Sequence, residues 1–426
     1  MDEQQAREHI EKIAHEAREA AALLASTRGE QRDAALLACA EAVRNARGTL
    51  QRENEKDIAR SNEFGLTEAM VDRLRLTDER VEKMAAALES IASQVDPVGR
   101  TIAAYNRPNG LRIEKRRVPL GVVGVIYESR PNVTADAAGL CLKSGNACIL
   151  RGGKEAMHSN LAIAAALRQG LSKAGLPTAA VAVIDNPDRA LVPAMAQAEG
   201  LIDLIIPRGG EGLIRAVAQA ATIPVIKHYA GNCHVYVHAD ADLEMAESIT
   251  LNAKCQRPGV CNAAETLLVD AAVAETFLPR VAAKLIEAGV ELRCDPASRD
   301  ILSAAGIEGI VEASEDDWRS EFLSLTLAVA VVSDLSAAIG HINTYSSSHT
   351  DAIVTESVTA ADRFVAEVDS SSVMVNASTR FSDGGEYGLG AEVGISTDKL
   401  HARGPMGAED LTTYKWIVTG HGHLRT

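Results

Sequence analysis

The sequence of 426 residues is longer than a typical single domain and predicts two or three domains. Its net charge of −15 argues against a nucleic-acid or anionic-membrane partner, because no basic excess is available to neutralise phosphates. A charged amino terminus, the lack of a membrane-length apolar run and seven scattered cysteines favour a cytoplasmic protein without a disulfide framework.

Residues 3–93 are predicted to form three or four amphipathic helices. Apolar side chains recur at helical spacing from Ile10 to Leu24, with charged side chains between them. Thr67 is expected to cap a later helix that continues through Leu88. This region contains no residue that we single out as catalytic.

Residues 99–118 are predicted to form a β-hairpin, because Asn109-Gly110 suits a tight turn between two strands. The strands are expected at Thr101–Tyr105 and Leu111–Val118. A two-stranded ribbon is marginally stable alone and needs a further surface. The predicted partner is the last strand, Tyr414–Thr419, from the same chain or from another subunit.

From residue 118 to residue 237, apolar runs alternate with helical stretches, which predicts a parallel, doubly wound α/β sheet. The expected strands are Val122–Ile126, Ala147–Leu150, Ala180–Ile184, Leu204–Ile206 and Val225–Ile226. Two strands end in glycine-rich turns, Leu150–Glu155 and Pro207–Gly212. Glycine lets backbone amides approach a phosphate, so these turns are candidate dinucleotide contacts, with ordinary turns as the alternative.

Residues 238 to about 380 are predicted to form a second α/β unit. The expected strands are Thr266–Val269, Leu327–Val332, Ala352–Val354 and Val373–Val375. A helix that begins near Asp240 is expected to end at Arg257-Pro258-Gly259. Cys261 follows on a tight loop beside Arg257, a typical setting for a reactive thiolate. From this loop alone, Cys261 could equally well be a small buried residue of the core.

Five segments, in order over nearly the whole chain, resemble the gamma-glutamyl phosphate reductase family of the aldehyde dehydrogenase superfamily. They are Tyr127–Thr134, Lys227–His234, Gln256–Val269, Asp369–Phe381 and Gly385–Gly407. The resemblance implies an aldehyde-dehydrogenase-like α/β fold with a Rossmann-like cofactor domain, an α/β catalytic domain and a small β oligomerisation arm. The cofactor domain is expected at 1–98, 119–237 and 382–405, the catalytic domain at 238–381, and the arm at 99–118 and 406–426.

The resemblance further implies NADPH-dependent reduction of L-glutamyl 5-phosphate to L-glutamate 5-semialdehyde, an oxidoreductase step of proline biosynthesis. Cys261 is then the nucleophile that forms a thioester, and Asn132 is the candidate oxyanion donor, with a plain turn residue as the alternative. The implied cofactor contacts are Arg151, Gly152, Gly153, Lys154, Arg208, Gly209, Gly210 and Glu321. The charges of Arg151 and Lys154 suit a 2′-phosphate, although Glu155 opposes them.

The implied substrate carries a phosphate and a carboxylate, which arginine, lysine and histidine can bind. The candidates are Arg130, Lys227, His228, Arg257 and Arg380, each with a solvated surface charge as the alternative. A homo-oligomer and functional coupling to glutamate 5-kinase are also expected, and no resident metal. The segment His228–Asn232 lacks the carboxylate that activates water in hydrolytic aldehyde dehydrogenases, which fits an acyl-phosphate enzyme.

Three alternatives remain open from the sequence. A related enzyme that uses a coenzyme A thioester or oxidises aldehydes would not depend on phosphate. A cofactor-free cysteine hydrolase that uses Cys261 with His228 or His234 would not bind NADPH. A catalytically inactive relative is the third, and the intact segment around Cys261 argues against it.

Overall fold

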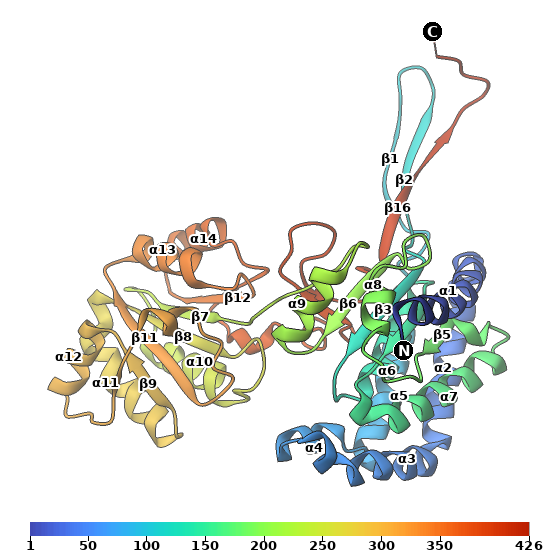
Figure 1. Cartoon of the computed structure of the whole chain (residues 1–426). Coiled ribbons are helices and arrows are strands. Elements are labelled where there is room, and N and C mark those ends of the chain that lie inside the picture. Colours follow the sequence, from blue (N-terminus) through green and yellow to red (C-terminus); the bar gives the residue numbers. More distant parts are fainter. Residues whose placement is uncertain (426) are drawn as a thin grey trace. The chain divides into compact units, whose positions relative to one another are not determined.

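The computed structural model describes residues 1–425, which divide into two compact units (Figure 1). Unit 1 comprises Met1–Lys227, Gly388–Ile395 and the segment from Pro405 onwards. Unit 2 comprises His228–Tyr387 and Ser396–Gly404. Unit 2 begins at His228, and within it Gly231 lies against the backbone of Cys261. The predicted division into functional domains stays a prediction.

Unit 1 begins with more helices than the three or four that were predicted, namely α1 (Glu3–Ser26), α2 (Gly29–Asn45), α3 (Arg47–Ala59), α4 (Glu68–Leu74), α5 (Asp78–Ser93) and the 3₁₀ helix η1 (Ser61–Phe64). Asp2 caps α1 by accepting the N–H of Gln5. The single helix predicted from Thr67 through Leu88 is wrong, because the chain forms α4 and α5 there. Thr67 does cap α4, but extended backbone at Arg75 ends it, and Thr77 caps α5.

Unit 1 contains a four-stranded sheet in the order β5-β4-β3-β6. Its strands are all parallel, as the alternating pattern predicts. Its strands are β3 (Val122–Tyr127), β4 (Ala147–Arg151), β5 (Val181–Val183) and β6 (Leu204–Arg208). The accompanying helices are α6 (Asn132–Lys143), α7 (Met157–Lys173), α8 (Leu191–Ala196), α9 (Glu211–Ala220), η2 (Lys154–Ala156) and η3 (Thr178–Ala180). The strand predicted at Val225–Ile226 is only one bridge, between Ile205 and Val225.

The predicted hairpin forms β1 (Thr101–Asn106) and β2 (Arg112–Pro119), with Gly110 at a positive φ of 90° in the turn. The last strand, β16 (Thr412–Thr419), pairs antiparallel with β2 along its whole length, within the same chain. Figure 1 shows these three strands as one long ribbon in unit 1. The side chain of Lys115 in β2 lies over the ring of Tyr414, with 3.5 Å from Nζ to the ring centroid.

Unit 2 contains a parallel sheet in the order β10-β9-β11-β8-β7-β12-β13. Its strands are β7 (Cys233–Val237), β8 (Ala264–Asp270), β9 (Glu291–Cys294), β10 (Val311–Glu312), β11 (Thr326–Val332), β12 (Thr350–Val354) and β13 (Ser372–Val375). Its helices are α10 (Leu243–Cys255), α11 (Ala271–Glu287), α12 (Pro296–Ala304), α13 (Leu335–Tyr345), α14 (Val358–Glu367), η4 (Glu315–Arg319) and η5 (Thr379–Phe381). The strands β7, β9 and β10 were not predicted, and β9 and β10 are short and partly polar.

A further two-stranded ribbon, β14 (Gly394–Ser396) with β15 (Gly404–Met406), forms within the segment Gly385–Gly407. None of the helices among the described residues is both long and apolar enough to cross a membrane.

Candidate active site

Cys261 lies on the predicted loop between a helix and a strand. Asp242 caps α10 by accepting the N–H groups of Glu244 and Met245, and α10 ends at Cys255, three residues before Pro258. The loop is held by Asn262, whose Nδ2 donates to the carbonyl of Ser382 at 2.9 Å. Cys261 is half-buried, so its thiol is neither locked in the core nor freely exposed.

Two histidines lie beside Cys261. One side-chain ligand atom from each of His228, Cys261 and His349 lies within 4.8 Å of the other two. The two imidazole rings meet edge to face, with 5.6 Å between centroids. His228 was predicted as a site residue, whereas His349 was missed.

Strand order explains why these three residues meet. The strands β8, β7 and β12 are neighbours and parallel, so they all begin at one edge of the sheet. Cys261, His228 and His349 each precede the first residue of one of these strands by one to five positions. The cluster therefore lies at the amino edge of this sheet, not at the carboxyl edge where ligands of open α/β sheets commonly bind.

Gly231 allows the segment of His228 to approach the nucleophile loop. A Cβ atom at Gly231 would lie 1.9 Å from the carbonyl oxygen of Cys261 and 2.5 Å from its Cα. The neighbouring thiol of Cys233 donates to the same carbonyl oxygen at 3.2 Å. Burial raises the pKa of the Cys233 thiol well above its usual value, so Cys233 stays protonated and acts as a hydrogen-bond donor.

Two predicted arginines belong to the same neighbourhood. Arg257 follows α10 and is exposed, and Arg380 lies in η5, where its Nε donates to Gln256 Oε1 at 2.9 Å. Burial lowers the pKa of Arg380, the charge of Arg257 lowers it further, and the charge of Cys261 opposes both. Arg380 is therefore within electrostatic reach of both Arg257 and Cys261.

A buried ion pair supports the same loop. Lys254 of α10 donates to Glu265 of β8, and both side chains are fully buried. Burial raises the pKa of Glu265 to about 7 against the opposing effect of Lys254. The other oxygen of Glu265 accepts the N–H of Leu323 at 3.2 Å, in the loop that carries Glu321. The pair thus ties the nucleophile helix to the predicted ribose-binding loop.

We expect Lys254→Met to lower the free energy of unfolding by about 3–5 kcal/mol, because it leaves the Glu265 carboxylate buried without its partner. The double variant Lys254→Met/Glu265→Leu should lose clearly less, since neither charge then stays buried. Urea unfolding at constant pH measures both changes. A double variant as unstable as the single one would contradict this account of the pair.

The remaining predicted residues belong to unit 1. Asn132 is the exposed first residue of α6, and its Nδ2 donates to Asp136 Oδ2 at 2.9 Å. Arg130 is exposed just before it, and Lys227 is the half-buried last residue of the first segment of unit 1. Their roles at the site of Cys261, including that of Asn132 as oxyanion donor, stay predictions.

The first glycine-rich turn follows β4. A Cβ at Gly152 would lie 2.1 Å from Asn160 Nδ2, so a larger residue there would displace the Asn160 side chain. Gly153 and Lys154 follow, and Lys154 Nζ lies 4.9 Å from the ring centroid of Phe64. Arg151 donates through Nη2 to the carbonyl of Pro187 at 3.1 Å, while its buried Nε has no hydrogen-bond partner among the described residues.

The second turn follows β6 and leads into α9. Arg208 pairs with Glu392 at 2.8 Å, and a Cβ at Gly209 would lie 2.5 Å from the carboxylate of Glu128. That carboxylate accepts the N–H of Gly210 at 2.8 Å, at the amino terminus of α9. An anion is therefore already favoured here, as expected for a helix amino terminus. The two turns fit a dinucleotide, provided that its pyrophosphate displaces Glu128.

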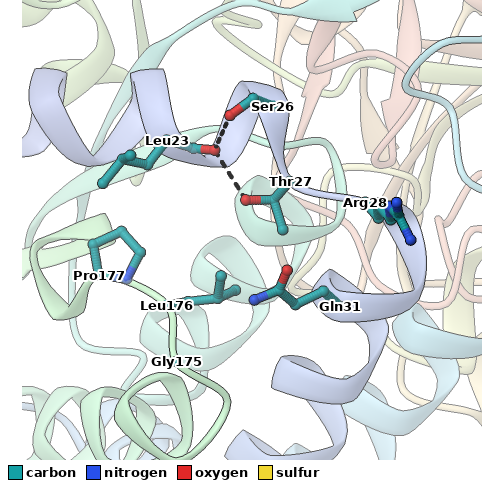
Figure 2. Close-up of a pocket in the computed structure, with 8 residues that line it drawn as sticks. All are labelled: Leu23, Ser26, Thr27, Arg28, Gln31, Gly175, Leu176 and Pro177. Atoms are coloured by element: carbon teal, nitrogen blue, oxygen red, sulfur yellow. Dashed lines mark hydrogen bonds between the residues drawn. The ribbon is translucent and has the colours of Figure 1, made fainter.

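A separate hollow of about 500 Å³ lies in unit 1, between the carboxyl end of α1 and the loop after α7 (Figure 2). The hydroxyls of Ser26 and Thr27 are turned back onto the carbonyl of Leu23 at 2.9 Å. Arg28 is the charged member of the eight lining residues, and none of the predicted site residues lines the hollow. Its chemistry does not point to a catalytic site.

Comparison with known proteins agrees with the fold. Residues 3–300 match the model of the aldehyde dehydrogenase family. The chain is 44% identical to the gamma-glutamyl phosphate reductase of Thermotoga maritima over 98% of this chain and 100% of that one, with a TM-score of 0.94. It is 31% identical to the enzyme of the same name from Saccharomyces cerevisiae, over 98% of each chain, with a TM-score of 0.54.

An acetylating aldehyde dehydrogenase from Geobacillus thermoglucosidasius shares the fold at 19% identity, with a TM-score of 0.71 over 100% of this chain and 99% of that one. The family match covers more than half of the chain, and the 44% and 31% identities extend over nearly all of it. Membership implies a nicotinamide cofactor. The chain belongs to the aldehyde dehydrogenase family and, within it, to the gamma-glutamyl phosphate reductases.

Proposed function

We propose that this chain reduces L-glutamyl 5-phosphate to L-glutamate 5-semialdehyde with NADPH and releases phosphate, as a step of proline biosynthesis. The observation that carries the proposal is the half-buried Cys261 on its loop, with His228 and His349 beside it and Arg380 within electrostatic reach. The likeness to the reductases over the full chain supports the choice of substrate. The seven cysteines, all free, suit a reducing cytoplasm.

In the first step, Cys261 gives its proton to the neighbouring imidazole pair, and the thiolate attacks the acyl carbon. The bond from that carbon to the phosphate oxygen breaks, and phosphate leaves with the electron pair. Cys261 is then held as a thioester. Arg257 and Arg380 favour both the thiolate and the departing phosphate, because each guanidinium can bind an anion through two N–H groups.

A nicotinamide cofactor held by Arg151–Lys154, Arg208–Gly210 and Glu321 would supply the hydride for reduction of the thioester. The residues of the chain stabilise the negative charge that forms on the former carbonyl oxygen. We assign this role to the backbone N–H of Cys261 and the side chain of Asn132, and such donors contribute about 3–4 kcal/mol each. When the carbon–sulfur bond breaks, the imidazole pair returns the proton to Cys261 and the aldehyde is released.

Phosphate dependence tests this function. Residues His228–Asn232 offer no carboxylate to activate water on the thioester, so phosphate should be the efficient acceptor in the reverse direction. With glutamate semialdehyde and NADP, we expect steady NADPH formation only when phosphate or arsenate is present. Without either, one burst equal to the enzyme concentration should be followed by near silence. A steady rate close to the phosphate-saturated one would overturn the proposal.

For the cofactor, we propose NADPH held by Arg151 to Lys154 at the ribose and by Arg208 to Gly210 near the pyrophosphate, with Glu321 at the nicotinamide ribose. Burial lowers the pKa of Arg151, and Glu155 beside it accepts a hydrogen bond from Ser129 Oγ at 2.7 Å. A 2′-phosphate would offer the Arg151 Nε the acceptor that it lacks among the described residues.

We expect Arg151→Ala/Lys154→Ala to raise the KM for NADPH about 10-fold or more, because two charge-assisted contacts are lost. The KM for NADH should change little. Lys173→Ala is a control, since its charge is paired with Glu41 on the surface of α7. An unchanged ratio of the two KM values would mean that the 2′-phosphate is bound elsewhere.

For assembly, we propose a homo-oligomer formed through the β1-β2-β16 ribbon. This ribbon exposes large apolar side chains, namely Ile102, Tyr105, Tyr414, Trp416 and Val418. Such a patch on a thin ribbon is typical of a surface that another subunit covers. Coupling to glutamate 5-kinase is a further part of the proposal, since an acyl phosphate is a reactive compound to release into water.

A further inference from the structure

The cluster of His228, Cys261 and His349 has the composition of a site for a borderline-soft cation. Thiolate and imidazole are the preferred ligands of Zn²⁺, which takes a tetrahedral arrangement. The three ligand atoms lie within 4.8 Å of one another. Tetrahedral bonds of about 2.1 Å to nitrogen and 2.3 Å to sulfur require separations of about 3.4–3.7 Å, so small side-chain rotations suffice.

The surroundings of His349 prepare one ring nitrogen for a metal. Its Nδ1 lies 2.8 Å from Thr350 Oγ1 and 3.8 Å from the Sγ of Cys233. When Nδ1 carries the proton and donates to the Thr350 hydroxyl, Nε2 keeps its lone pair. A metal-binding histidine typically has its other nitrogen held in this way, which fixes both its tautomer and its orientation.

The three residues come from three chain segments that pack together independently of any ion. Gly231 lets the segment of His228 lie directly against the backbone of Cys261. The hydrogen bond from Asn262 to the carbonyl of Ser382 fixes the loop of Cys261. His349 is buried at the start of β12. A cation would therefore meet a largely preformed set of three ligands.

We propose that His228, Cys261 and His349 form an inhibitory binding site for Zn²⁺ and chemically similar divalent cations. Binding replaces the thiol proton of Cys261, which is released to solvent, with a sulfur–metal bond, and no oxidation occurs. The occupied sulfur cannot attack an acyl carbon. The positive charges of Arg257 and Arg380 weaken the binding of a cation. A chelator can therefore remove the bound cation.

Cobalt(II) is the probe for this site, because a thiolate–cobalt bond gives a charge-transfer absorption that zinc lacks. Titration of the reduced, full-length protein with Co²⁺ should produce this band and saturate it at one equivalent per chain. Cys261→Ala should abolish the band. His228→Ala should weaken Co²⁺ binding about 10-fold or more; His228 is only half-buried, so this variant should fold. His349→Gln should do the same as His228→Ala.

Cys255→Ala and His238→Ala are matched controls that remove a thiol and an imidazole of the same unit outside the cluster. His238 is engaged with Thr355 Oγ1 at 2.9 Å. Both controls should keep the band. Zn²⁺, but not Mg²⁺, should protect Cys261 from alkylation in a peptide map, and EDTA should remove the protection.

Absence of the band in the unmodified protein would overturn the proposal. A band that survives in Cys261→Ala would also overturn it. So would full cobalt affinity in both His228→Ala and His349→Gln. These readouts need no turnover. Binding therefore does not depend on the proposed function, although its inhibitory effect rests on Cys261 as the nucleophile. A cobalt band in a protein without reductase activity would count against the proposed function alone.

Discussion

Cys261→Ala should reduce turnover by about 10⁴-fold or more, because the acyl group then has no sulfur to which it can be transferred. No neighbouring thiol can take over. Burial raises the pKa values of both Cys233 and Cys255, so both stay protonated near neutral pH. Cys233 is also engaged with the carbonyl of Cys261. The assay is the phosphate-dependent formation of NADPH from glutamate semialdehyde.

The matched control is Cys255→Ala, which removes a partly buried thiol at the end of α10 and should keep most of the activity. Cofactor fluorescence should show that Cys261→Ala still binds NADPH, since the proposed cofactor residues belong mainly to unit 1. Equal loss of activity in both variants would mean that the loop is sensitive to any change, and the assignment of Cys261 would fail.

The sequence carried enough information for the fold and for the nucleophile loop. Pro258, the helix cap at Asp242 and the apolar run before Asp270 all act locally, so α10, the loop and β8 could be predicted one after another. The likeness to a known family joined these local predictions into one architecture. Arg257, Arg380 and His228 were proposed from that likeness, and all three belong to the same unit as Cys261.

His349 could not be found in the same way. It follows the polar run Ser346–Ser348, which resembles an ordinary surface loop, and the predicted strand began only at Ala352. Its place beside Cys261 depends on the neighbourhood of β8, β7 and β12, and strand order is a long-range property that periodicity does not report. A predicted strand at Cys233 would have given the missing signal. The segments that lead into β7, β8 and β12 would then have been expected to meet at one edge of the sheet.

The second large effect concerns a residue without a side chain. We expect Gly231→Ala to lower kcat about 10²-fold, because the new methyl group would lie 1.9 Å from the carbonyl oxygen of Cys261. The obstacle is backbone and not a flexible side chain, so the two segments must separate by about 1 Å or more to restore van der Waals contact. A displacement of that size at a reacting group typically costs about 10²-fold in rate.

The separation should also break the contact from Cys233 Sγ to the Cys261 carbonyl and change the distance between Cys261 and His228. The reactivity of Cys261 towards iodoacetamide should therefore change along with kcat. Gly340→Ala is the matched control, since Gly340 lies in α13 of the same unit and a Cβ there meets nothing within 4 Å. That variant should keep its activity and gain up to about 1 kcal/mol in stability, because alanine favours a helix over glycine. If Gly231→Ala retained the kcat of the unmodified protein, the close approach of these two segments would not be what positions the nucleophile.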